Sequence, residues 1–95
     1  MAVQTQKLVL GSEFLVDLAP ERKIDTRGQV CPYPSFETAK LAQTVQSDEV
    51  IEIISDDKYA ALNSIPTVLR LRNFEYGVLE IEEGVWSIKA RRAHP

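Results

Sequence analysis

The only cysteine of this 95-residue chain, Cys31, lies between a glycine-containing segment and two prolines. Gly28 precedes it, and Pro32 and Pro34 follow it. A proline is tolerated in the first turn of a helix, where the amide hydrogens have no partner within the helix, so the prolines predict a helix that begins beside Cys31. The residue before a proline favours an extended backbone. We therefore expect Cys31 at or next to the helix N-cap.

A thiol at this position has a defined chemistry. Helix N-termini carry partial positive charge and spare amide donors, which favour the thiolate. A thiolate attacks sulfur–sulfur bonds and can accept a sulfane sulfur. Because Pro32 and Pro34 remove two donors and leave the Tyr33 amide as the best placed, we expect a modestly lowered pKa for Cys31. The alternative, a buried cysteine acting as a small apolar residue, is less compatible with a loop-to-helix corner.

The elements that must position Cys31 follow from the hydrophobic periodicity. Residues 23–26 predict a short strand that ends at Gly28. A helix is predicted after Pro32 through about Gln46, where Ser47-Asp48 stops it. Its buried face has helical spacing and consists of Thr38, Leu41, Ala42 and Val45.

The second half of the chain continues with β-branched and helical patterns. Residues 50–55 predict a central strand. Asp56-Asp57 opens a second helical region in which Pro66 either marks the start of the regular helix or kinks it. A strand from Tyr76 to Ile81, a turn at Glu83-Gly84 and an antiparallel strand over residues 85–90 complete the pattern.

The resulting order is β-α-β-α-β-β. It predicts an α+β fold, a two-layer α/β sandwich with a mixed four-stranded sheet and two helices on one face. We assign residues 21–95 to this domain and residues 1–20, which end at Ala19-Pro20, to an N-terminal leader. Alternating apolar residues make strand-like pieces in the leader as plausible as a disordered arm.

The composition and net charge exclude several classes of protein function. Apolar residues make up 44% and charged residues 26% of the chain, which is typical of a globular protein. The net charge of −3 argues against direct nucleic-acid binding. A single cysteine excludes an internal disulfide, and no apolar run is long enough to span a bilayer. We therefore expect a cytoplasmic protein, with no cofactor and no metal site.

Residues 25–34 carry a motif that resembles a known family. Asp25, followed by Arg27-Gly28-x-x-Cys31-Pro32-x-Pro34, looks like the signature of the TusA/SirA-like sulfurtransferases, including the TusA, YeeD and YedF groups. The resemblance covers about residues 22–92 and continues through residues 53–57 and Ile65-Pro66. Ser64 stands where TusA proper usually has Asp, and the preceding spacing is slightly longer. These departures favour a YedF-like or other paralogue.

The resemblance implies a persulfide relay. Cys31 would be the catalytic residue, accepting sulfane sulfur from a cysteine desulfurase or a rhodanese-like donor and passing it to an acceptor protein. Pro32 and Pro34 belong to the supporting motif, as do Asp25, Arg27, Gly28 and Tyr33. Turnover without partner proteins is expected to be poor, because the chain has no second thiol. The alternative function is a non-catalytic regulatory or docking partner of a membrane transporter for thiosulfate or a similar compound.

Other charged and aromatic residues have more than one interpretation. Tyr33, Phe36 and Lys40 share the helix face opposite the buried stripe, so they either form a docking patch for partner proteins or Phe36 packs against the leader or a loop. Asp56 and Asp57 suit the entrance of a helix better than a pair of catalytic carboxylates. The basic residues 89, 91 and 92 are interpreted as an exposed strand end.

Overall fold

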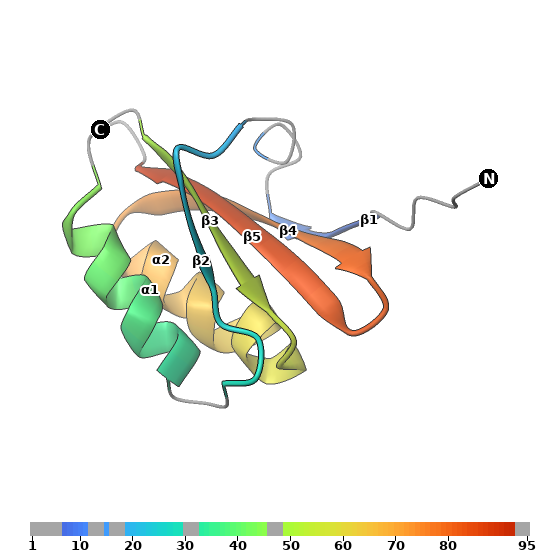
Figure 1. The fold of residues 1–95 in the computed structure, drawn as a ribbon. Helices are drawn as coiled ribbons and strands as arrows, with labels where there is room; N and C mark the ends of the chain where they lie inside the picture. Colours follow the sequence, from blue (N-terminus) through green and yellow to red (C-terminus); the bar gives the residue numbers. More distant parts are fainter. Residues whose placement is uncertain (1–6, 12–14, 16–18, 30–32, 46–48, 93–95) are drawn as a thin grey trace.

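The β-branched run of residues 50–55 forms a buried strand, and four further strands assemble around it (Figure 1). The computed structural model describes residues 7–11, 15, 19–29, 33–45 and 49–92. In chain order the elements are β1 (Lys7–Gly11), β2 (Arg22–Asp25), α1 (Tyr33–Gln43), β3 (Val50–Ser55), the π-helical turn η2 (Ala60–Ser64), α2 (Ile65–Leu71), β4 (Phe74–Glu82) and β5 (Val85–Arg92).

The predicted α+β sandwich is confirmed, with one additional strand. The sheet has the order β1-β4-β5-β3-β2, in which only β2 and β3 are parallel neighbours. Both α-helices lie against the same face of the sheet (Figure 1). The prediction of four strands was wrong, because residues 7–11 of the leader pair with β4 at the edge of the sheet. The boundary at residue 20 stays a prediction.

Helix α1 ends earlier than predicted, at Gln43 instead of about Gln46. The Thr44 amide bonds to the Leu41 carbonyl at 3.0 Å, which tightens the last turn. Two arginines from the sheet then bind the terminal carbonyls. Arg22 donates to Thr44 O at 2.7 Å, and Arg92 donates to Val45 O at 3.0 Å. Residues 47 and 48, the predicted stop, lie outside the described residues.

The second helical region resolves the two alternatives for Pro66. The amide of Ile65 bonds to the carbonyl of Ala60, which closes the wider turn of η2. The regular helix α2 then begins at Ile65, with Pro66 in its first turn. The wider turn of η2, which already has helical φ and ψ at Ser64, directly precedes this first turn. The interpretation that the helix starts near Pro66 is therefore confirmed.

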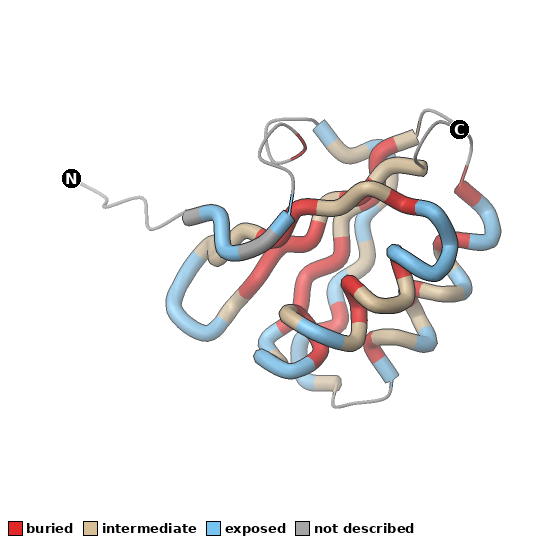
Figure 2. The backbone as a smooth tube through the Cα atoms, turned by 180° about the vertical axis from the view of Figure 1, so that it is seen from behind, coloured by how far each residue is buried: buried red, intermediate tan, exposed pale blue. Residues whose placement is uncertain are grey.

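The hydrophobic core lies between the sheet and the helices. Ile51 and Ile53 of β3 and Ile88 of β5 meet Ile65 and Leu69 from the helical layer, and all five are completely buried. Figure 2 shows this buried layer running along the inner strands. At the end of the β4–β5 hairpin, Gly84 has a φ of 79°, as the predicted turn requires. This core holds the carboxyl ends of β2 and β3 beside the start of α1.

Candidate functional site

A tight turn joins the end of β2 to the segment that contains Cys31. The Gln29 amide bonds to the Thr26 carbonyl at 3.0 Å, and Gly28 has a φ of 87°. A four-residue turn with a positive φ at its third position favours glycine. Thr26 is buried and holds the turn to β3, since both its amide and its hydroxyl donate to Ile54 O, at 2.8 and 2.6 Å.

Asp25 and Arg27 of the predicted motif form a local clamp across this turn. Asp25 Oδ1 accepts the Arg27 amide at 3.0 Å, and Arg27 Nη2 donates to Asp25 Oδ2 at 2.7 Å. The side-chain hydrogen bond from the guanidinium, followed by the backbone bond from Arg27, lowers the pKa of Asp25. The same bond raises the pKa of Arg27. Both side chains are exposed, so the clamp shapes the turn more than it stabilises the fold.

Asp56 is a site residue that the sequence analysis misinterpreted. Its carboxylate oxygens accept the Gly28 amide at 3.1 and 3.2 Å, so it holds the turn instead of opening a helix. Asp57 does cap the helical region, because its Oδ1 accepts the amides of Tyr59 and Ala60 at 3.0 and 3.3 Å. A signal was available: β2 and β3 are parallel neighbours, and residues that follow such strands meet at one edge of the sheet.

Helix α1 starts at Tyr33, two residues after Cys31. Pro34 is buried in the first turn, and its carbonyl accepts the Thr38 hydroxyl at 2.8 Å. Cys31 and Pro32 lie outside the described residues, so their predicted roles stay predictions. The structure does place the residues on either side, since Gln29 and Tyr33 line one hollow.

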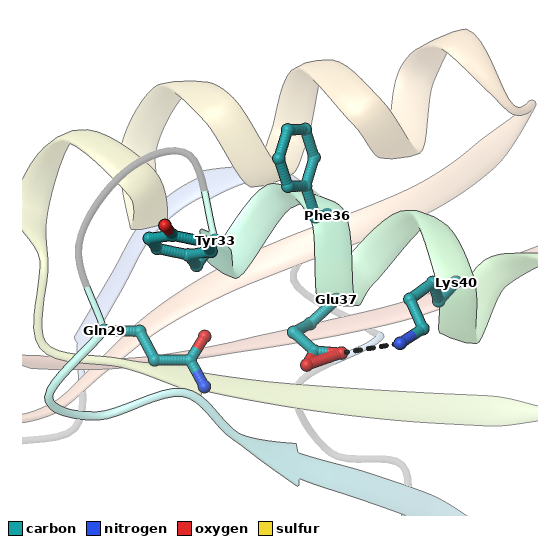
Figure 3. A pocket seen from close by; sticks show the side chains of 5 residues that line it. All are labelled: Gln29, Tyr33, Phe36, Glu37 and Lys40. Carbon is teal, nitrogen blue, oxygen red and sulfur yellow. Dashed lines mark ion pairs between the residues drawn. The ribbon is translucent and has the colours of Figure 1, made fainter.

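This hollow has a volume of about 500 Å³ and is bordered by one face of α1 (Figure 3). Its lining residues are Gln29, Tyr33, Phe36, Glu37 and Lys40. The rings of Tyr33 and Phe36 meet edge to face with their centroids 6.5 Å apart. Both residues are nevertheless exposed, Tyr33 over 59% and Phe36 over 58% of its surface. Lys40 pairs with Glu37 at 3.8 Å. Tyr33, Phe36 and Lys40 line this hollow together from α1, Gln29 joins them from the turn, and the docking role of the three stays a prediction.

Phe36 also borders a second hollow, of about 450 Å³, between α1 and α2. Ala39 lines it from α1, and Val68 and Leu71 line it from α2. Leu71 is 80% exposed, which is unusual for a leucine at the end of a helix. The exposed apolar surface beside the motif therefore extends over both helices.

The C-terminal basic residues have structural partners. Arg91 pairs with Glu75 at 3.1 Å. The Arg92 guanidinium lies 5.1 Å from the centroid of the Phe74 ring and donates to carbonyls at the end of α1. The interpretation of an exposed strand end was wrong, because Lys89, Arg91 and Arg92 are half-buried and the two arginines contact β4 and the end of α1. Among the described residues there is no group of three or more potential metal ligands and no helix of the length and apolarity that a membrane span requires.

Comparisons with known proteins agree with the fold. The family model described as Sulfurtransferase TusA matches residues 22–92. "Putative sulfur carrier protein YedF" of Escherichia coli is 33% identical over 70% of this chain and 83% of its own length. "Putative sulfur carrier protein" of Thermotoga maritima is 36% identical over 65% of this chain and 75% of its own. The crystal structure of a SirA-like protein from Desulfitobacterium hafniense superposes with a TM-score of 0.66, at 24% identity over 77% of this chain and 99% of its own.

Proposed function

Because this chain belongs to the sulfurtransferase TusA family, we propose that it is a sulfur carrier whose Cys31 holds sulfane sulfur as a persulfide. The observation that carries the proposal is the family match over residues 22–92, which includes the whole motif around Cys31. Relatives that match this region bear the name of sulfur carriers. The persulfide, the donor and the acceptor belong to the proposal, as does the cytoplasmic setting.

The proposed transfer has two balanced steps. The Cys31 thiolate attacks the terminal sulfur of a donor persulfide, a new sulfur–sulfur bond forms, and the donor's own sulfur leaves as a thiolate. An acceptor thiolate then attacks the terminal sulfur on Cys31, and Cys31 leaves as a thiolate. No net oxidation occurs in either step. The chain holds no second cysteine, so each step requires a partner and turnover by the isolated protein is poor.

The described residues support this role by the frame that they build around the motif. Asp25 and Arg27 shape the turn, and Asp56 ties Gly28 to the end of β3. On the other side, Pro34 is buried at the start of α1. The described residues on both sides of Cys31 thus have defined positions, which limits the loss of entropy that orienting reactants requires. The helix N-terminus that follows favours the thiolate.

We further propose that the exposed face of α1 recruits the partner proteins. Tyr33 and Phe36 present apolar ring surface to solvent beside the motif, and Lys40 adds a charged margin. Exposed aromatic residues around a hollow are typical of protein interfaces, where a few such residues supply most of the binding free energy. A cysteine desulfurase or a rhodanese-like protein would dock here to deliver sulfur, and the acceptor would use the same face.

The test is mass spectrometry of the protein after incubation with a persulfurated donor. We expect a gain of one sulfur atom that dithiothreitol removes, and no gain in Cys31→Ser. A wild-type protein that gains no sulfur from any persulfide would contradict the carrier role. Binding to a membrane transporter without any gain of sulfur would instead support the alternative, a docking or regulatory partner.

A further inference from the structure

The leader strand β1 (Lys7–Gly11) lies outside the region that matches the family, yet it is part of the sheet. It pairs antiparallel with β4 at the edge, where Leu8 faces Leu79 and Gly11 faces Gly77. Without β1, the nine-residue β4 would be an edge strand. An uncovered edge offers unpaired amide and carbonyl groups to any other extended chain.

Gly11 makes this pairing specific. Its φ is 88°, and a Cβ atom at this position would lie 2.3 Å from the Tyr76 carbonyl oxygen and 3.1 Å from the Gly77 Cα. Real Cβ atoms essentially never lie as close as 2.3 Å to another heavy atom, and a backbone oxygen cannot move aside as a flexible side chain does. The pairing of β1 with β4 in this register therefore requires glycine opposite Gly77, and the leader supplies that glycine.

Leu15 provides a second attachment. It is completely buried but does not belong to the core between the sheet and the helices. Ile51 and Ile53 of β3 face that core, so Val50 and Ile54 face the opposite side of the sheet by strand alternation, and both are also buried. The leader connects β1 at one edge to β2 at the other edge. It is therefore held by β-pairing and by a buried leucine.

We propose that β1 is an intramolecular ligand of the β4 edge that prevents this edge from pairing with a second copy of the chain. The partner is a second copy because strand addition requires only another extended segment, and an exposed β4 would meet its own equivalent most readily in a purified protein. The proposal concerns the sheet and is independent of the chemistry of Cys31.

The test compares Gly11→Ala with Gly84→Ala in the full chain. Both glycines have a positive φ, but an added Cβ meets Tyr76 O at position 11 and nothing within 4 Å at position 84. We expect Gly11→Ala to raise amide hydrogen exchange over residues 7–11 of β1 about tenfold or more, because β1 leaves the edge, and to form a dimer in sedimentation experiments through the β4 edge that β1 has left. We expect the wild type and Gly84→Ala both to sediment as monomers. Unchanged exchange, or release of β1 without any dimer, would overturn the proposal.

A peptide provides the second arm of the experiment. A synthetic copy of residues 5–17 should bind Gly11→Ala and dissociate its dimer, whereas the same peptide with alanine at position 11 should not. The wild-type protein should bind the peptide at least about tenfold more weakly, because its edge is occupied. Equal binding to both proteins would contradict an occupied edge. The near-ultraviolet circular dichroism of the buried Trp86 reports whether Gly11→Ala is folded. If this variant does not fold, Leu15→Ser is used in its place, and the same rise in amide exchange of β1 is expected.

Discussion

The carboxylate of Asp56 accepts the backbone amide of Gly28, which ties the end of β3 to the turn that precedes Cys31. Asp57, the next residue, caps the helical region instead. Two adjacent acidic residues of the same type thus have separate tasks, one at the candidate site and one in the scaffold. This separation allows the contribution of the turn to be measured against a closely matched control.

We predict that Asp56→Ala slows sulfur uptake by Cys31 from glutathione persulfide several-fold, because the turn loses its attachment to β3. Asp56→Asn should react nearly as fast as the wild type, since its amide oxygen still accepts the Gly28 hydrogen bond. The free energy of unfolding should fall by only about 1 kcal/mol in Asp56→Ala.

Asp57→Ala is the control for this prediction. Loss of its helix cap should cost about 1 kcal/mol of stability and leave the uptake rate unchanged. Equal slowing in Asp56→Ala and Asp57→Ala would show that general loosening, and not the tie to Gly28, affects the reaction.

The clamp between Asp25 and Arg27 predicts a small dependence of stability on acid pH. The Arg27 hydrogen bonds lower the pKa of Asp25 in the folded protein. A carboxylate with a lowered folded pKa stabilises the fold above its unfolded pKa of about 3.9 and loses this contribution as the pH falls through the folded value. The difference in urea midpoint between the wild type and Asp25→Asn should therefore be present at neutral pH and disappear in strong acid. A difference that does not change with pH would rule out this linkage.

The aromatic face of α1 predicts a separation between protein donors and small donors. Phe36→Ala should reduce sulfur uptake from a donor protein about tenfold or more, the effect typical of an interface residue that anchors a partner. Uptake from glutathione persulfide should not change, because Phe36 is exposed and contributes little to the fold. Tyr59→Ala is a matched control, since Tyr59 is equally exposed but lies outside the hollow beside the motif. Normal uptake from the donor protein in Phe36→Ala would remove the docking role.

Arg92 predicts a stability effect that is independent of function. Its guanidinium stacks over Phe74 and donates to the carbonyls of Ala42 and Val45 at the end of α1. Arg92→Ala should lower the free energy of unfolding by about 1–2 kcal/mol, from the lost cation–π contact and the unpaired carbonyls. Lys89→Ala removes another basic residue of the same strand and should lower the free energy of unfolding by less. Thermal denaturation measures both, and equal losses would contradict the special position of Arg92.

Much of the candidate site could be predicted from the sequence, because its conformation is determined by residues that are close together in the chain. Two prolines specify where α1 begins, and helical spacing specifies that Tyr33, Phe36 and Lys40 share a face. Gly28 marks a turn for the same kind of reason, since the preference for positive φ belongs to the residue itself. Gln29, by contrast, joins the hollow only because the turn carries it next to α1.

The sequence by itself determined the order of the elements, the start of α1 and the motif around Cys31, because propensity, periodicity and proline geometry act over a few residues. Three features depended on the tertiary structure alone. Asp56 accepts the Gly28 amide, and arginines of β2 and β5 donate to the carbonyls at the end of α1. The leader also adds β1 to the sheet beside β4. Each of these depends on groups far apart in the chain. Such pairings form only where packing of the core brings both partners to one place, and no local pattern encodes that position.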